Sequence, residues 1–271
     1  MPSADLFAIV VSLKAALGSF AILAVMFVPL ERMYPARSKQ GIVRPGLRLD
    51  IVFFFGQYLA WNAAAIFVAV EIASWLGGYM PSAPKAAFLA QPFWLQAIEA
   101  ILIGDVCVYW YHRASHRFDF LWRFHAVHHS SEHLDWVAAH REHPVDGILT
   151  QLAMNVPAML LGFSPRAIAG FIVFSSVWAI FVHSNVRIPL GPLKWLFGAP
   201  EFHHWHHARV ERTKHNFANL APFLDVLFGT HHCPEKEETY TLGDPTEKST
   251  KSYLAFMVEP FLPRDRESAR G

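Results

Sequence analysis

The amino-acid sequence predicts an all-α integral membrane protein, in which about four to five membrane helices are capped by a cytoplasmic, histidine-rich helical domain. Hydrophobic residues make up 53% of the 271 residues and charged residues only 17%, a balance too apolar for most soluble domains. The apolar residues gather in five stretches, and all sixteen histidines lie between His112 and His232, many of them at helical spacing.

Three apolar stretches, at roughly 8–30, 51–71 and 92–111, are long enough to cross a bilayer, which takes about 20 residues. Two shorter stretches, 145–162 and 166–183, are separated only by a Gly-Phe-Ser-Pro turn. We expect them to form a helical hairpin that spans the membrane or enters it partway. Any one stretch could be a buried core helix, but five in a chain of this size favour a membrane protein.

Basic residues predict the orientation. The segment 31–48 carries five arginines and lysines, whereas the next connection, 78–91, carries only Lys85. Short loops rich in Lys and Arg stay in the cytoplasm. The third span then ends at the cytoplasmic surface with His112, and the hairpin returns His183 to the same side. The N-terminus lacks the features of a cleaved signal peptide, so we expect the first span to be retained.

We expect a single membrane domain over residues 1–271. Its parts follow the chain, with membrane spans at 1–111, a cytoplasmic metal-binding cap at 112–144 and 184–233, the helical hairpin at 145–183 and a polar C-terminal tail at 234–271. Within the tail, Tyr253–Val258 is predicted to form a short amphipathic helix.

Eight of the histidines lie in three boxes. Residues three and four positions apart share one face of a helix, so each box presents its imidazoles in one direction. Imidazole binds iron, zinc, copper and nickel, and converging boxes would hold two transition-metal ions. The boxes are His112 and His116; His125, His128 and His129; and His203, His206 and His207.

Several other classes of protein are disfavoured by composition. A net charge of +1 gives no electrostatic argument for a nucleic-acid partner. The two cysteines, Cys107 and Cys233, cannot form a disulfide framework, and the chain has no C-x2-C metal motif.

A series of motifs from about residue 104 to 230 carries a family resemblance. The motifs are Gly104-Asp105-x3-Tyr109-Trp110-x-His112-Arg113-x2-His116, Leu121 to Ser130 with its H-x2-HH box, His143-Pro144-x-Asp146, His183-Ser184-Asn185, Glu201-x-His203-x2-His206-His207, Asn216-Phe217 and Asp225-x2-Phe228-Gly229-Thr230. Their order and spacing resemble the fatty acid hydroxylase and sterol desaturase superfamily. The resemblance implies integral-membrane helical enzymes whose cytoplasmic cap holds two irons. Such enzymes use dioxygen and external electrons to hydroxylate or desaturate unactivated C–H bonds of lipids.

Carried over residue by residue, the resemblance implies metal ligands in all three boxes and one between them. The implied ligands are His112, His116, His125, His128, His129, His183, His203, His206 and His207. Some members place a further histidine four positions after His183, where this chain has Arg187, so one metal's ligand count stays open. We predict that Arg187 is no ligand, because a guanidinium stays protonated. His204 falls at a variable position and is expected at the surface.

Ligand imidazoles usually donate their second N–H to a carboxylate or carbonyl. The candidates for such contacts are Asp105, His143, Asp146 and Glu201, with Glu132, Asp135 and Glu142 as further carboxylates. Asp105 is preferred, because it precedes His112 by two helical turns on the same face. A solvated loop is an equal alternative for Glu132 and Asp135. His140 is interpreted as a ligand or a neighbour of one, and His215, His231 and His232 as local structure.

The favoured function is a diiron oxygenase that hydroxylates a sterol, fatty acyl or similar lipid. Desaturation of the same substrates is the first alternative, since it needs only a second hydrogen abstraction. A membrane zinc hydrolase is an alternative from another class, although catalytic zinc takes about three protein ligands and no H-E-x-x-H motif is present. A haem electron carrier is disfavoured, because the histidines cluster at one surface, and a metal-storage protein stays open.

The expected cofactors are two iron ions, which zinc could replace in purified protein. The sequence has no haem, flavin, nicotinamide or ferredoxin signature and no room for a fused cytochrome b5 domain. We therefore expect a separate electron donor, such as cytochrome b5, a ferredoxin or a reductase. A bacterial inner membrane is favoured, with the endoplasmic reticulum as the alternative.

Overall fold

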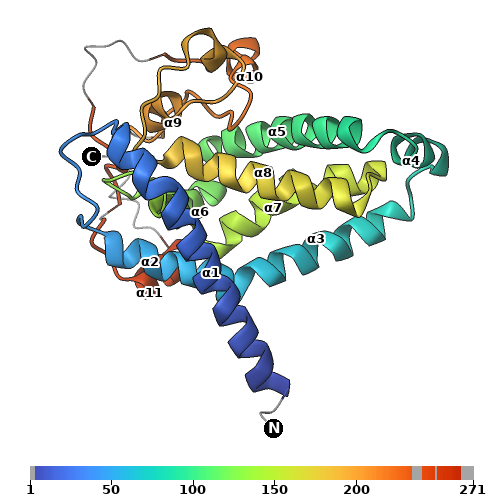
Figure 1. Cartoon of the computed structure of the whole chain (residues 1–271), viewed down its shortest axis with the longest axis horizontal. Helices are drawn as coiled ribbons and strands as arrows, with labels where there is room; N and C mark the ends of the chain where they lie inside the picture. Colours follow the sequence, from blue (N-terminus) through green and yellow to red (C-terminus); the bar gives the residue numbers. More distant parts are fainter. Residues whose placement is uncertain (1–3, 211, 234–239, 248, 264–271) are drawn as a thin grey trace.

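The structure is a computed structural model that describes residues 4–210, 212–233, 240–247 and 249–263 (Figure 1). The regular secondary structure of these residues is helical. Within these residues the only β-type contacts are two isolated bridges, Pro35 with Val186 and Ala208 with Leu242. The predicted all-α class is confirmed.

The helices are best given in chain order. They are α1 (Ala4–Met33), α2 (Leu47–Gly56), the π-helical turn η1 (Gln57–Trp61), α3 (Asn62–Gly77), α4 (Ser82–Leu89), α5 (Phe93–Arg117), α6 (Asp119–His129), the 3-10 turn η2 (Ala138–His140), α7 (Pro144–Leu161), α8 (Pro165–His183), the 3-10 turn η3 (Gly191–Trp195), α9 (Pro200–His206), α10 (Phe223–Leu227), α11 (Tyr253–Val258) and the 3-10 turn η4 (Glu259–Phe261).

Four helical segments are long and apolar enough to cross a membrane. They are Val11–Met33 of α1, Leu47–Gly77 (which joins α2, η1 and α3), α5 and α8. Their outward faces carry large apolar side chains such as Val25, Phe67, Trp94 and Val173, each more than 60% exposed. Exposed apolar surface on this scale is expected of helices that contact lipid. The prediction of about four to five membrane helices is therefore confirmed with four.

The fifth apolar stretch forms α7, which with α8 makes the predicted hairpin. The turn at Gly162 has φ 84°, a left-handed conformation that glycine adopts without a Cβ clash. Ser164 then caps α8 by accepting a hydrogen bond from the Ala167 N–H at 3.3 Å. Figure 1 shows α3, α5, α7 and α8 running side by side, with α4 at one end and α6, α9 and α10 at the other.

The connection between α1 and α2 lies at the histidine-bearing end of this bundle. Arg37 Nη1 is 3.1 Å from His204 Nδ1, and the Arg187 N–H donates to the Tyr34 carbonyl at 2.8 Å. The basic segment used to predict the orientation thus contacts the segments that carry the histidines.

The C-terminal helix α11 matches the predicted Tyr253–Val258 helix. Ser252 caps it by accepting from the Ala255 N–H, and Phe256 packs with Phe53 and Val127. Of the predicted polar tail, residues 234–239, 248 and 264–271 lie outside the described residues.

Two glycines allow close approach between the helices. A Cβ on Gly104 of α5 would lie 2.2 Å from Cζ of Phe171 on α8, and a Cβ on Gly147 of α7 would lie 2.3 Å from Cζ3 of Trp61. Neither position has room for a methyl group unless a buried aromatic ring moves. The close packing of α5 against α8 and of α7 against η1 therefore requires glycine, which has no side chain, at these two positions.

We expect Gly104→Ala to destabilise the protein by about 1–3 kcal/mol, because the added methyl overpacks the contact with Phe171. The measurement is the thermal unfolding midpoint in detergent. Gly170→Ala on α8 is the matched control, since a Cβ there meets nothing within 4 Å. Equal midpoints for the two variants would contradict the close-approach explanation.

Candidate metal centre

The nine histidines carried over as ligands come together in two groups. The five-histidine group consists of His112, His116, His125, His129 and His206, and the four-histidine group of His128, His183, His203 and His207. Within each group, one nitrogen of every ring lies within 4.8 Å of the others. Each group is therefore compact enough for a single ion to contact all its members. The contributing elements are α5, α6, α8 and α9.

Each H-x2-HH box contributes to both groups. His125 and His129, four positions apart on α6, point into the five-histidine group, while His128 belongs to the other. The second box is reversed, because His203 and His207 share the four-histidine group. Residues i and i+4 lie on one helix face, whereas successive residues diverge by about 100° around the helix, so the i+3 ring can enter the neighbouring group. The two groups are in contact, since the His129 and His207 rings stack at 4.3 Å between centroids.

Backbone carbonyls fix the orientation of four rings through Nδ1. The acceptors are Phe217 for His112 (2.8 Å), Arg141 for His128 (3.1 Å), Ala179 for His183 (2.6 Å) and His215 for His206 (2.8 Å). A carbonyl oxygen can only accept, so each of these Nδ1 atoms carries the proton. In the neutral ring, Nε2 is then left with a lone pair.

In the four-histidine group these lone pairs face one another. His128 Nε2 and His183 Nε2 are 2.9 Å apart, although both rings already donate through Nδ1. His203 Nε2 is 2.8 Å from His183 Nε2 and 3.1 Å from His207 Nε2. Converging unprotonated nitrogens repel unless a cation lies among them. The donor set therefore fits a metal ion.

The five-histidine group shows the same feature as unpaired nitrogens. Nε2 of His112, His125, His129 and His206 is buried and has no hydrogen-bond partner among the described residues. Both ring nitrogens of His116 are also without such a partner. An unpaired buried polar atom costs about 1–3 kcal/mol, and five such rings in one place form a donor set that could hold a metal ion.

Burial favours the neutral form of five rings that lie outside the membrane-spanning helices. Burial lowers the pKa of these rings well below the usual 6.5, and the neighbouring imidazoles lower it further. At His128 and His206 a hydrogen bond to a backbone carbonyl opposes the shift without cancelling it. The five rings are His128, His129, His203, His206 and His207. A neutral imidazole is the form that binds a metal.

Arg187 contributes to neither group. It is exposed, and its recorded contact is the backbone hydrogen bond to Tyr34. The four-histidine group accordingly has one member fewer than the five-histidine group.

Asp146 contacts a ligand candidate directly. Its Oδ2 accepts from His125 Nδ1 at 2.8 Å, and its Oδ1 accepts from the Tyr111 hydroxyl at 2.5 Å. Burial favours the protonated carboxyl, but His125 and the two hydrogen bonds outweigh it and lower the pKa of Asp146. The ionised carboxylate orients the His125 ring.

Asp105, the preferred candidate, bonds a loop instead of an imidazole. Its two oxygens accept from the backbone N–H groups of Leu220 (3.0 Å) and Ala221 (2.9 Å). The same loop supplies the Phe217 carbonyl that holds His112. Asp105 therefore reaches the metal centre through one intervening segment, which its helical spacing from His112 could not reveal.

The other candidates have structural contacts. His143 caps α7 by accepting from the Val145 N–H, and Glu201 pairs with Lys194 at 3.1 Å. Glu132 forms an exposed pair with Arg209, whereas Asp135 is buried in an ion-pair network. Neither His143 nor Glu201 contacts a histidine of the two groups through a recorded hydrogen bond.

The expectation that His204 lies at the surface is wrong. The residue is 2% exposed, its Nε2 lies 2.9 Å from the Ser184 carbonyl and its Nδ1 faces Arg37. Nε2–H can therefore donate to the residue that follows His183, while the Arg37 guanidinium donates to Nδ1. A variable position in a box can still be buried when a distant loop covers it.

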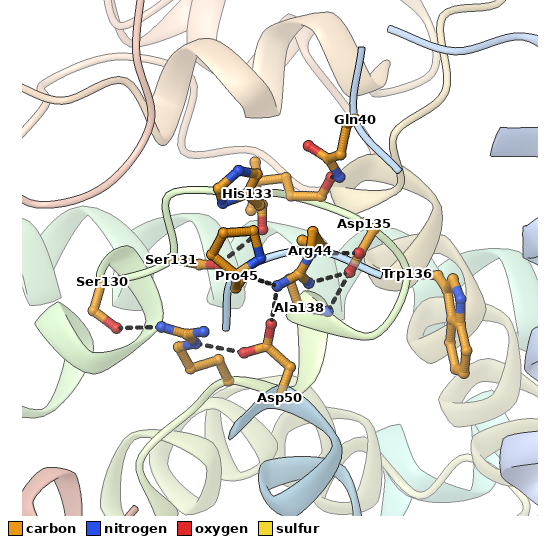
Figure 2. A network of polar contacts seen from close by, with 12 residues as sticks. Gln40, Arg44, Pro45, Asp50, Ser130, Ser131, His133, Asp135, Trp136 and Ala138 are labelled. Carbon is orange, nitrogen blue, oxygen red and sulfur yellow. Dashed lines mark hydrogen bonds and ion pairs between the residues drawn. The ribbon is translucent and has the colours of Figure 1, made fainter. Parts of the chain in front are cut away.

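Sequence reasoning missed a buried ion-pair network behind the centre. Figure 2 shows Arg44 between two carboxylates: its Nε and Nη2 donate to Asp135 at 2.7 and 2.6 Å, and its Nη1 is 2.7 Å from Asp50. Arg141 Nε donates to the other Asp50 oxygen at 2.5 Å. The carbonyl of Arg141 holds His128, so the network positions a ligand candidate. Arginines and aspartates this far apart in sequence carry no spacing signal.

A cavity of about 240 Å³ opens beside both groups. His112 and His125 of one group and His128, His183 and His203 of the other form part of its wall. Most of the rest comes from η1, η2, α3, α5, α7 and α8, with apolar side chains that include Ile66, Val108, Met154 and Ile172. A long apolar molecule could therefore reach the histidines from membrane depth.

Comparison with known proteins finds relatives that are named as lipid hydroxylases, monooxygenases and sterol desaturases. The fatty acid hydroxylase family matches residues 97–230. An ornithine lipid hydroxylase of Rhizobium tropici is 30% identical over 217 residues, which cover 74% of this chain and 65% of that protein. An alkylglycerol monooxygenase of Danio rerio is 30% identical over 178 residues (64% and 38%), and a Delta(7)-sterol 5(6)-desaturase of Gibberella zeae 26% over 141 residues (50% and 37%).

The chain spans about two thirds of the length of the first of these relatives and a little over a third of the others. No solved structure matches it.

We expect Arg44→Ala to lower stability by about 3–5 kcal/mol, because it leaves the buried Asp50 and Asp135 without their shared cation. The readout is the thermal midpoint together with metal content. Arg209→Ala is the control: both partners of its pair with Glu132 are more than 40% exposed, and such pairs contribute about 0–1 kcal/mol. Similar losses of stability in the two variants would contradict the idea that burial makes the Arg44 network more stabilising than an exposed ion pair.

Protein stripped of metal should lose stability as the pH falls below 6.5. Burial lowers the pKa of His140 and His204 from 6.5 to about 3, so between these values the unfolded chain binds protons that the folded chain does not. Each such histidine removes about 1.4 kcal/mol per pH unit. Free energies of unfolding at pH 7.5 and 5.5 measure the slope. His204→Gln should have the shallower slope, and an unchanged slope would contradict the assignment.

Proposed function

Because the chain belongs to the fatty acid hydroxylase and sterol desaturase superfamily, we propose that it is a membrane oxygenase that hydroxylates an unactivated C–H bond of a lipid. The observation that carries the proposal is the cavity whose wall combines apolar residues from the membrane helices with histidines of both groups. An apolar chain in that cavity would bring a C–H bond beside the metal centre.

We propose that the nine histidines hold two iron ions, one in each group. The support is the donor chemistry: neutral imidazoles, lone pairs that converge and ring orientations fixed by carbonyls. Two irons bound there would supply the activation of dioxygen, which side chains cannot perform. Overall, one dioxygen, two electrons and two protons convert a C–H bond into a C–OH group and one water.

The surrounding residues hold the geometry of this centre. Asp146 orients His125 and is itself held by Tyr111. The Phe217 carbonyl orients His112, and Asp105 holds the loop that supplies it. Burial of the rings excludes water from the site, which protects the oxidation from side reactions.

The two electrons come, in this proposal, from a separate donor such as cytochrome b5, a ferredoxin or a reductase. We further propose that residues 112–144 and 184–233 form a cap on the cytoplasmic side, where such donors are found. The support is the positive-inside rule applied to 31–48, together with the contact between Arg37 and His204. A bacterial inner membrane is the proposed location.

Two alternatives make different predictions. A desaturase would use the same centre and remove a second hydrogen, giving a lipid lighter by two hydrogens instead of heavier by one oxygen. A membrane zinc hydrolase would release lipid fragments without consuming dioxygen. Mass spectra of lipids from cells with and without the gene distinguish all three. A hydrolysed lipid with no oxygenated or desaturated species would refute the oxygenase.

We expect about two iron ions per chain in protein produced with ample iron. His128→Ala and His206→Ala should each abolish turnover and release about one ion, because they remove ligands from different groups. Metal analysis by mass spectrometry, with dioxygen uptake, measures both effects. His133→Ala is the control, since His133 belongs to neither group. One ion or none in the unaltered protein would refute the diiron centre.

A further inference from the structure

His140 places an unpaired hydrogen-bond acceptor in the cavity wall. Its Nδ1 lies 2.8 Å from Gln57 Oε1, an oxygen that can only accept, so Nδ1 carries the proton and Nε2 a lone pair. The side chain is 6% exposed, and Nε2 is buried with no partner among the described residues. His140 lines the cavity but belongs to neither histidine group. Its lone pair is therefore available to a molecule in the cavity.

The ring that carries this acceptor is held firmly. It packs edge-on against Phe54, with 4.7 Å between ring centroids, and Gln57 fixes its tautomer. Gln57 is the first residue of the π-helical turn η1. Single π-turns occur frequently at functional sites, where they redirect a side chain out of the regular helix. The acceptor is thus part of a preorganised surface.

Polar side chains continue this surface below the histidines. Asn62 on α3, Thr150 and Gln151 on α7, and Ser175 and Ser176 on α8 all line the cavity. Polar groups inside a membrane bundle are costly and are usually retained for a ligand or a solute pathway. Ile66 and Ile172 provide apolar wall in the same cavity. Its chemistry suits an amphiphile better than a plain hydrocarbon chain.

We propose that the substrate is a lipid bearing an O–H or N–H group close to the carbon that is oxidised, and that His140 Nε2 accepts a hydrogen bond from that group. The oxidation rests on the proposed function, whereas the binding rests on the cavity alone. A hydrocarbon segment at this position would leave the buried lone pair unpaired. His140 is then a residue that determines specificity, because it holds the polar end of the lipid beside the histidines.

The test uses two probes with the same alkyl chain and the same oxygen atoms, of which only one has O–H donors; His140→Phe controls for the added methyl groups of the other. 1-O-Hexadecylglycerol carries two hydroxyl groups, and 1-O-hexadecyl-2,3-di-O-methylglycerol carries none. Binding is measured by titration of the metal-loaded protein in detergent without an electron donor, so that no turnover occurs. We expect the unaltered protein to bind the diol about tenfold more tightly, the effect of one buried hydrogen bond. His140→Phe should bind both probes equally.

Two further variants serve as controls. His140→Gln keeps an acceptor at the position and should retain part of the preference for the diol. His133→Phe makes the same substitution outside the cavity lining and should retain all of it. Equal affinities in the unaltered protein, or no binding of either probe, overturn the proposal. Loss of metal from His140→Phe also overturns it, because His140 would then be a ligand.

The result stays distinguishable from failure of the proposed function. Protein that prefers the diol but oxidises no lipid would refute the oxygenase while leaving the binding inference intact. Oxygenated lipids together with equal binding of the two probes would do the reverse.

Discussion

The repulsion among unprotonated imidazole nitrogens is the constraint on which the rest of this structure depends. In the four-histidine group, the Nε2 atoms of His128 and His183 lie 2.9 Å apart although both rings already donate through Nδ1, a separation that a cation between them would relieve. Without one, the close approach persists only because a carbonyl holds each of these two rings from behind. The anchors are the carbonyl of Ala179 on α8 itself and that of Arg141 in a connecting segment, and the Phe217 carbonyl holds His112 of the other group in the same way. The connections between helices therefore matter as much to the centre as the helices that carry the boxes.

Buried carboxylates hold those connections in place. Asp50 binds Arg141, whose carbonyl orients His128, and Asp105 binds the loop that orients His112. Asp225 supports the same loop by accepting from the Phe217 N–H at 2.8 Å. Each carboxylate acts on a ring through one peptide segment, so its effect is on ring orientation and not on the charge at the metal. Asp146 is the exception, because it contacts His125 directly. The centre thus combines one charged contact with several neutral carbonyl contacts, which limits how far each ring can rotate.

Periodicity and hydropathy were sufficient to predict the helical class, the hairpin at Gly162 and the short helix at Tyr253–Val258, because these depend on local sequence. Periodicity also identified the eight histidines of the boxes, and the family resemblance added His183; the role of all nine as ligands stays a prediction. The division of each box between two groups was not predicted, since it depends on how α6 and α9 are rotated against each other. Asp105 was expected to contact His112, because the two residues share a helix face. A shared face does not determine which loop packs against that face, and Asp105 instead bonds the loop at Leu220 and Ala221. His204 was misplaced because its burial comes from Arg37 and Ser184, residues with no sequence relation to the box.

The division of the boxes has a consequence for biosynthesis. The five-histidine group needs His206 as well as α5 and α6, and the four-histidine group needs His128 as well as His183 and α9. No stretch of chain that ends before His206 contains either set in full, although the first six helices carry five of the nine rings. During synthesis the early histidines must therefore wait without the full set of neighbouring rings. Both histidine groups become complete at nearly the same late moment, when α9 docks against α8.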